Sequence, residues 1–232
     1  LGQRLQRRAV EAPAGRRSEL ERLETFALGD QPLVIHIQGI PGIGKTHLLN
    51  ALATIVSAKG VSVVNLDARW CEPSPAAFCR TICRQIGAAE TEDPAAVALS
   101  LSNRAARTLL VLDSYESFRL LDYWLRQFFL PSLGDTVRTI LSSREQPRPA
   151  WRIAPAWKGF FDSMLLETFP PEIALEYLHS QGIPEVSARE LNRVAHGHPL
   201  ALSLGSALYF ASGKVRGSTA TLHEVLEHMA AL

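Results

Sequence analysis

The sequence predicts an α/β fold, in which a mainly parallel β-sheet with flanking helices is followed by a small all-helical region. Three observations predict it. Short aliphatic and β-branched runs alternate with segments of helical spacing over 33–170, as expected for βαβ units. The run at 108–113, TLLVLD, is almost wholly apolar, which favours a strand buried on both faces of a parallel sheet. From Pro171 onward the pattern is entirely helical.

The elements are expected in a regular order. Strands are predicted at 33–38, 61–66, 108–113, 137–142 and 163–167. Helices are predicted at 45–59, 74–86 and 120–129, and then near 171–180, 187–195, 199–211 and 219–230. Gly60 ends the first of these helices and Pro131 limits the third, because Gly favours a left-handed C-cap and Pro cannot continue a helix. The acidic, Ala-rich stretch near 88–105 is expected to be a variable connection.

Composition and charge exclude several classes of protein. The 232 residues carry 24 Lys and Arg against 23 Asp and Glu. With a net charge this close to zero, the protein as a whole has no positive electrostatic field that would attract nucleic acid or an anionic membrane. No apolar run approaches the roughly 20 residues of a membrane span, and no signal peptide opens the chain. The odd number of cysteines, three, argues against a secreted disulfide framework. We therefore expect a reduced, cytoplasmic protein without a membrane partner.

Two further features concern the origin of the chain. Twenty of its basic residues are Arg and four are Lys, a skew that, with the abundant Ala, is typical of a GC-rich bacterial genome. The sequence begins at Leu1 rather than Met, which suggests a piece excised from a longer parent protein.

The strongest motif is GIPGIGKT at 39–46, which fits G-x-x-x-x-G-K-[ST] between a predicted strand and a predicted helix. Glycines let successive backbone N–H groups turn inward around a phosphate, and the helix N-terminus adds partial positive charge. We expect Lys45 to reach the β- and γ-phosphates of a nucleotide and the Thr46 hydroxyl to ligate Mg²⁺. A Gly-rich turn without a ligand is the alternative. The predicted cofactor-binding residues of this segment are Gly39, Ile40, Pro41, Gly42, Ile43, Gly44, Lys45, Thr46 and His47.

One acidic residue ends the predicted strand at 108–113 and another follows it. A phosphate loop needs a carboxylate at the end of a neighbouring strand to hold Mg²⁺, and Asp113 is placed to supply it, as a Walker B residue. Hydrolysis also needs a base or a water-positioning group, and Glu116 is the carboxylate nearest after Asp113. The alternative is that Glu116 is a solvated loop residue and that hydrolysis is slow or absent.

A cationic residue follows the predicted strand at 137–142. Arg144 is expected to sense the γ-phosphate, because the tip of this strand would lie near it. The alternative is a surface arginine that forms a salt bridge with Glu145 or its surroundings. The predicted catalytic residues are Glu116, Asp113, Lys45 and Arg144, and the predicted metal ligands are Thr46 and Asp113.

Five segments in this order resemble the STAND class of P-loop ATPases, which includes NB-ARC and NACHT modules and the large ATP-binding LuxR-type bacterial regulators. They are GRRSEL at 15–20, the loop at 39–46, LLVLDSYE at 109–116, TILSSRE at 139–145 and HGHPLAL at 196–202. The last resembles the family's G-x-P-L-A-L signature at the start of a helix.

The resemblance implies a sheet ordered 5-1-4-3-2 and a helical lid. It implies that Pro199 packs near the adenine, with residues 14–17, Arg16 among them, closing the other side. It also implies a switch between an ADP-bound closed form and an ATP-bound open form that oligomerises. One departure concerns Ser114, which stands where many members carry a second acid. Catalysis would therefore fall to Glu116.

The combined interpretation has three regions: a helical entry segment at 1–30, a P-loop nucleotide-binding domain at 31–170 and a helical lid subdomain at 171–232. We expect an ATP/ADP-binding, slowly ATP-hydrolysing regulatory module that uses Mg²⁺. Its partners would be effector or sensor domains of a longer parent chain, which would form an ATP-dependent homo-oligomer, and no direct nucleic-acid binding is expected. The alternatives are a non-hydrolysing nucleotide-binding module, a P-loop small-molecule kinase and a DNA-loading AAA+ ATPase.

Three groups of residues receive plain structural interpretations. Cys79 and Cys83 are expected to be packed, reduced thiols. Trp151 and Trp157 are expected to pack a Pro-rich connection against the domain. The aromatic residues of 123–129 are expected in the core or on an oligomer surface. His196 and His198 either read the β-phosphate or make structural hydrogen bonds.

Overall fold

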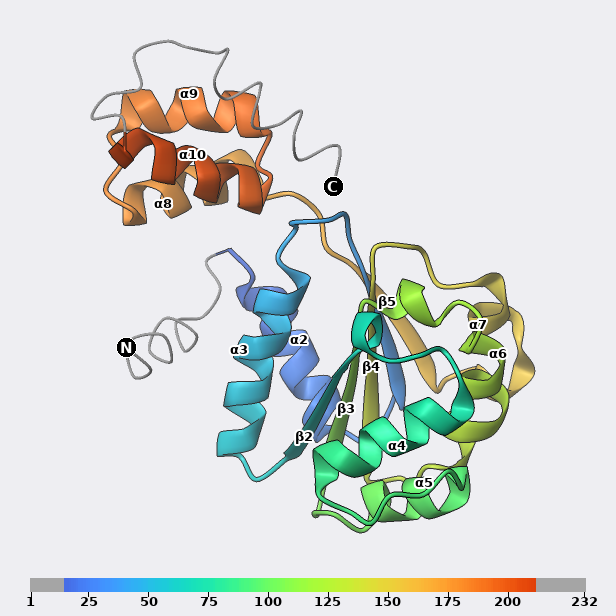
Figure 1. Cartoon of the computed structure of the whole chain (residues 1–232). Coiled ribbons are helices and arrows are strands. Elements are labelled where there is room, and N and C mark those ends of the chain that lie inside the picture. Colours follow the sequence, from blue (N-terminus) through green and yellow to red (C-terminus); the bar gives the residue numbers. More distant parts are fainter. Residues whose placement is uncertain (1–14, 212–232) are drawn as a thin grey trace. The chain divides into compact units, whose positions relative to one another are not determined.

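The computed structural model describes residues 15–211 (Figure 1). Contacts divide the chain into two compact units. The first contains the sheet and its flanking helices, from residues 18–40 and 45–166. The second contains the C-terminal helices from 167 onward, together with 15–17 and the loop tip 41–44. The predicted helix at 219–230 lies outside the described residues.

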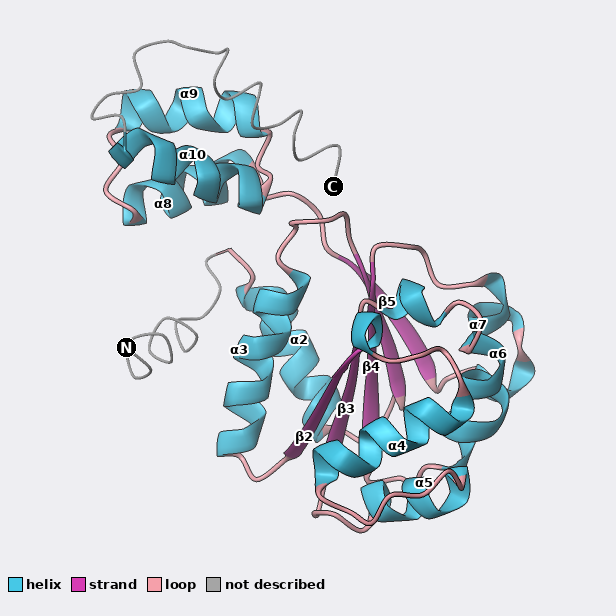
Figure 2. Cartoon of the chain, in the orientation of Figure 1, coloured by secondary structure: helices cyan, strands magenta, loops and turns pink. Residues whose placement is uncertain are grey.

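Five parallel strands form the sheet of the first unit (Figure 2). They are β1 (Val34–Gln38), β2 (Ser62–Asp67), β3 (Thr108–Asp113), β4 (Val137–Ser143) and β5 (Phe161–Leu165). Their spatial order is β2-β3-β4-β1-β5, so the predicted order 5-1-4-3-2 is confirmed. Every position of β3 and β4 is buried, as expected for central strands covered on both faces.

Helices cover both faces of this sheet, with α2 and α3 on one and α4, α5 and α6 on the other (Figure 1). The helices of the first unit are α2 (Arg17–Leu28), α3 (Lys45–Ala58), α4 (Pro75–Ile86), α5 (Pro94–Ser102), α6 (Asp122–Trp124) and α7 (Pro149–Ile153). Local sequence sets their ends. Ser74 caps α4 by accepting from the Ala77 N–H, and Gly87 ends that helix in the left-handed region, with φ 68°.

The sequence interpretation misses α5 and misplaces β5. The stretch near 88–105, expected to be a variable connection, contains α5, whose Val97, Ala98 and Leu101 are buried. Asp93 starts this helix by accepting from the Ala95 N–H. Its short length and alanine content hide the amphipathic pattern that identifies longer helices. The last strand, expected at 163–167, begins two residues earlier, at Phe161.

The predicted helix at 120–129 is irregular, and its expected end before Pro131 is wrong. After α6 the chain forms a π-helical turn, Leu125–Phe129, and then a 3₁₀ turn that contains Pro131. The π turn brings residues five apart onto one face. Trp124 stacks on Phe129, with 5.4 Å between ring centroids, and both rings pack edge-on against Phe78. Packing of these three rings against one another accounts for the departure from α-helical geometry.

A buried carboxylate ties three segments of the first unit together. Asp122 is 2% exposed, and its Oδ1 accepts hydrogen bonds from the Tyr115 hydroxyl and from Trp151 Nε1, both at 2.9 Å. Trp151 and Trp157 are buried, which confirms that they fix the Pro-rich connection to the domain. Burial, with Asp122 nearby, raises the pKa of Tyr115 well above its usual value, so the phenol remains a donor.

The cysteines are free and packed, as expected, and the aromatic residues of 123–129 divide between the interior and the surface of the first unit. Cys79 and Cys83 are free and buried, and burial raises the pKa of the Cys79 thiol to about 11. Phe129 belongs to the core and the partly buried Trp124 packs against it, whereas Tyr123 and Phe128 are exposed.

The described part of the second unit contains three helices, α8 (Pro171–Ser180), α9 (Glu185–Ala195) and α10 (Pro199–Ala211). Its core contains Ala174, Leu178, Leu191 and Leu202. The expected start of α9 at 187 is two residues late, because Glu185 already begins the helix after Pro184. Within the described part of the chain, no helix has the length and apolar character needed to cross a membrane.

Replacing Asp122 tests the buried network. Asp122→Ala leaves two buried donors without their acceptor, so we expect the free energy of unfolding to fall by about 2–4 kcal/mol. Urea unfolding followed by tryptophan fluorescence measures it. The control is Asp162→Ala, which removes a surface ion pair with Arg22 and is expected to cost less than about 1 kcal/mol. Equal stability of the two variants would contradict the importance of the network.

Candidate nucleotide site

The loop at 39–46 joins β1 directly to α3, as the motif predicts. Gly42 and Gly44 adopt φ values of +73° and +99°, a region that side-chain-bearing residues rarely occupy. A Cβ at Gly42 would also lie 2.8–2.9 Å from His198 and Leu200, inside the second unit. Both glycines are therefore required by the backbone path of the loop.

Lys45 folds its side chain back over the start of this loop. Its Nζ donates to the Gly39 carbonyl at 2.6 Å and to the Ile40 carbonyl at 3.2 Å. Burial lowers the pKa of Lys45, while Glu116 and Asp113 oppose this shift. A partly desolvated ammonium held by neutral carbonyls is suited to receive a phosphate anion.

Asp113 and Thr46 meet at the carboxyl end of β3. The Thr46 hydroxyl donates to Asp113 Oδ2 at 2.8 Å. The other carboxylate oxygen, Oδ1, accepts from Ser142 Oγ at 2.7 Å and from the Ser114 N–H at 2.8 Å. A hydroxyl and a carboxylate side by side form an oxygen donor set that suits Mg²⁺, so these two residues fit the predicted metal site.

A sharp turn after β3 positions Glu116. Ser114 has φ 55°, in the left-handed region, and the 3₁₀ turn η2 (Tyr115–Phe118) begins after it. Glu116 Oε1 accepts from Arg144 Nε at 2.8 Å, and Oε2 accepts from Ser143 Oγ at 3.0 Å and from the Arg144 N–H at 3.2 Å. The structure thus brings together Glu116 and Arg144, and the ion-pair partner of Arg144 is Glu116 rather than Glu145.

The charge state of Glu116 follows from these contacts. Burial by itself raises the pKa of its carboxyl group, but hydrogen bonds from Arg144, the backbone and Ser143 outweigh burial and lower it. Glu116 is therefore ionised at neutral pH, as a general base requires, and it is a bonded, half-buried group rather than a solvated loop residue.

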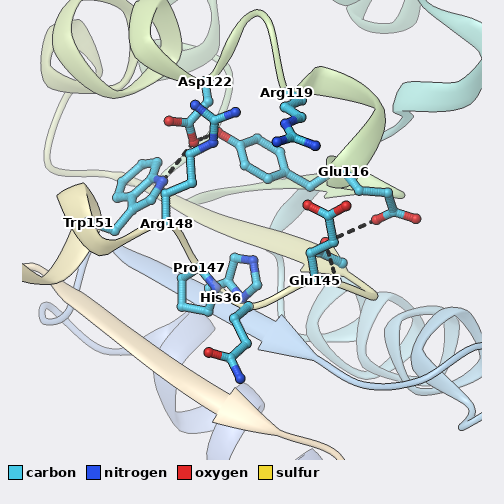
Figure 3. A pocket seen from close by; sticks show the side chains of 11 residues that line it. His36, Glu116, Arg119, Asp122, Glu145, Pro147, Arg148 and Trp151 are labelled. Carbon is cyan, nitrogen blue, oxygen red and sulfur yellow. Dashed lines mark hydrogen bonds between the residues drawn. The ribbon is translucent and has the colours of Figure 1, made fainter.

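A small cavity of about 20 Å³ lies beside Glu116 in the first unit, with room for one water molecule (Figure 3). The residues that line this cavity include Asp122, Trp151, Arg119 and His36. His36 is 2% exposed, and burial, aided by Arg152, lowers the pKa of its imidazole to about 4, so the ring is neutral at pH 7.

In the second unit, the loop tip is held by side chains distant in sequence. Arg16 is buried, donates to the Ile43 carbonyl at 3.2 Å and the Glu167 carbonyl at 2.5 Å, and places its guanidinium 4.8 Å from the centre of the Phe169 ring. His198 Nε2 lies 2.9 Å from the Pro41 carbonyl oxygen. His198 thus has a structural contact with the loop.

The other predicted residues are placed as follows. Pro199 is the first residue of α10. His47, in the first turn of α3, is exposed, and His196 ends α9 in the left-handed region.

Two serines at the end of β4 have roles that the sequence interpretation did not assign. Ser142 and Ser143 each contact one of the predicted acids. The sequence feature that could have identified them is a pair of adjacent hydroxyl residues directly before Arg144.

Comparison with known proteins supports a family assignment. The model of the NACHT domain matches residues 33–178. Among curated proteins, none matches the sequence significantly.

Solved structures resemble the whole fold at low sequence identity. Drosophila ORC bound to DNA has a TM-score of 0.62 at 13% identity, over 96% of this chain and 63% of that chain. Cdc6p from Pyrobaculum aerophilum has a TM-score of 0.62 at 15% identity, over 88% and 65%. AMPPCP-bound DnaA from Aquifex aeolicus has a TM-score of 0.55 at 15% identity, over 93% and 66%. These likenesses show the fold, and the chain spans about two thirds of the length of each relative.

Replacing Arg16 tests its hold on the loop tip. Arg16→Ala removes the donors to the Ile43 and Glu167 carbonyls, so we expect the amides of 42–44 to exchange with solvent about tenfold faster, as for the loss of a charge-assisted hydrogen bond. Hydrogen exchange with mass spectrometry measures this. Arg193→Ala removes an exposed arginine of α9 in the same unit and serves as the control. Unchanged exchange in Arg16→Ala would show that other contacts fix the loop.

Proposed function

Because the chain belongs to the NACHT family of P-loop NTPases, we propose that it is the ATP- and ADP-binding module of a STAND-type regulatory switch in the cytoplasm, with slow ATP hydrolysis. The observation that supports this most directly is the clustering of Lys45, Thr46, Asp113 and Glu116 around the carboxyl ends of β1 and β3. Effector domains and ATP-dependent assembly of a parent chain belong to the same proposal.

The phosphate loop binds the nucleotide in this proposal. Backbone N–H groups of the loop and the Lys45 ammonium hold the phosphates, and Lys45 exchanges its carbonyl partners for phosphate oxygens. Thr46 and Asp113 would hold Mg²⁺, which supplies positive charge to the phosphate oxygens. Pro199 offers a flat apolar face to the adenine, and Arg16 supports the loop tip rather than contacting solvent.

Glu116 acts as the general base in the proposed hydrolysis. It takes a proton from the attacking water as the water oxygen bonds to the γ-phosphorus, and the bond from that phosphorus to the bridging oxygen breaks, with its electron pair leaving on ADP. Arg144 moves from Glu116 to the γ-phosphate, where its charge stabilises the transition state.

A non-hydrolysing module is the second candidate function. Ser114 stands where many members of the family have an acid, and the hydrogen bonds to Glu116 that lower its pKa also make it a weaker base. In that case nucleotide binding alone would set the conformation.

Removing the lysine charge tests nucleotide binding. Lys45→Ala deletes a charge-assisted contact in a partly buried site, so we expect ATP and ADP affinity to fall by about 10²-fold. Isothermal titration calorimetry measures both nucleotides. Lys59→Ala, in which the surface pair with Glu24 is lost, is the control and should bind as the wild type does. Unchanged affinity in Lys45→Ala would place the site elsewhere.

Two acid variants separate binding from chemistry. Asp113→Ala should abolish the Mg²⁺ dependence of nucleotide affinity, because it removes the carboxylate beside Thr46. Glu116→Gln should keep nucleotide affinity and slow single-turnover hydrolysis by about 10²-fold or more. Equal turnover in Glu116→Gln and the wild type would remove Glu116 from the mechanism and favour water activation by another group. Absence of turnover in the wild type would favour the non-hydrolysing module.

A further inference from the structure

The last two residues of β4 are serines that serve different carboxylates. Ser142 Oγ donates to Asp113 Oδ1, and Ser143 Oγ donates to Glu116 Oε2. Both serines are buried, with exposed fractions of 0% and 2%. The end of one strand therefore supports both acids that the proposed function employs, each through a separate hydroxyl.

We propose that Ser143 is the positioning residue for Glu116: its hydroxyl fixes Oε2 so that Oε1 is the oxygen that receives the proton from the attacking water. The inference rests on the proposed role of Glu116 as the base. Ser143 itself touches no reacting atom and acts through Glu116.

The hydroxyl of Ser143 has a fixed orientation. Its oxygen accepts the Glu145 N–H at 3.0 Å, so its single proton is left to point at Glu116 Oε2. The Arg144 N–H, from the backbone, contacts the same oxygen at 3.2 Å. Oε2 is thus held by the hydroxyl of the buried last residue of β4 and by the backbone N–H of the residue that follows it.

The other oxygen is held differently. Oε1 accepts from the Arg144 side chain, which is 51% exposed. An exposed arginine is held weakly, because water screens the pair and the long side chain gains freedom on release. Oε1 is therefore the oxygen that becomes available when Arg144 moves, while Oε2 keeps the carboxylate in place.

The neighbouring cavity has a second arginine in its lining. Glu116, Ser143 and Arg119 line the same space (Figure 3), and among the described residues the ion pair of Glu116 is with Arg144. The Ser143 hydrogen bond opposes a turn of the carboxylate toward Arg119.

The first test measures the carboxyl group directly and requires no hydrolysis. In protein labelled with ¹³C at glutamate carboxyls, Glu116 is assigned by its loss in Glu116→Gln. In Ser143→Ala its titration should move to higher pH, because the anion loses a donor, and Ser143→Thr should restore it. Ser142→Ala is the matched control and should leave the titration in place. An unchanged Glu116 titration in Ser143→Ala overturns the proposal.

The second test follows hydrolysis. In Ser143→Ala we expect kcat at its plateau to fall by about tenfold with KM for ATP nearly unchanged, and the acid limb of the pH profile to move upward, since the base is protonated at higher pH. In Ser142→Ala the Mg²⁺ requirement should rise and the acid limb should stay. An acid limb that stays in Ser143→Ala overturns the proposal.

Two further outcomes are distinguishable. If the wild type binds ATP but never turns it over, the proposed function and the positioning role both fail, while the carboxyl titration still decides whether Ser143 contacts Glu116. If Ser143→Ala does not fold, Ser143→Cys keeps the volume with a weaker donor and should move the titration and the acid limb in the same direction.

Discussion

The parallel alignment of β3, β4 and β1 is the constraint on which the rest of the structure depends. Because parallel strands end at the same edge of a sheet, the residues that follow β1, β3 and β4 meet there, although they are far apart in sequence. Lys45, Asp113, Glu116 and Arg144 come together only through this order. A different strand order would leave the same motifs in the sequence without a site.

The carboxylates that meet at this edge of the sheet need hydrogen-bond partners there. Buried ionisable groups cost free energy unless they are paired or hydrogen-bonded. Each acid here receives several donors, Asp113 from Thr46 and the serine end of β4, and Glu116 from Ser143 and Arg144. The hydrogen bonds that offset the cost of burying Asp113 and Glu116 also fix the orientation of these carboxylates and keep Glu116 ionised. Stability and the proposed chemistry therefore depend on the same hydrogen bonds.

The sequence predicted the features that have local signatures. The loop at 39–46, the apolar strand ending at Asp113 and the capped helix α4 each follow from neighbouring residues, whereas the strand order came from a family resemblance. The π turn before Pro131 was missed because it depends on packing of Trp124 and Phe129 against Phe78, which are distant in sequence. The partners of Ser142 and Ser143 were missed for the same reason, since a hydroxyl carries no pattern that names its acceptor.

The tip of the loop at 39–46 belongs to the second unit by its contacts. Residues 41–44 pack with the C-terminal helices, while Ile40 and Lys45, on either side, belong with the sheet. The carbonyls of Pro41 and Ile43 contact His198 and Arg16. A ligand shifts a conformational equilibrium only by its differential affinity for the two states. If the amides of 41–44 hold a phosphate, as we propose, they belong to a backbone that Arg16 and His198 already fix, so the fit of that backbone to ATP or to ADP depends on these two side chains.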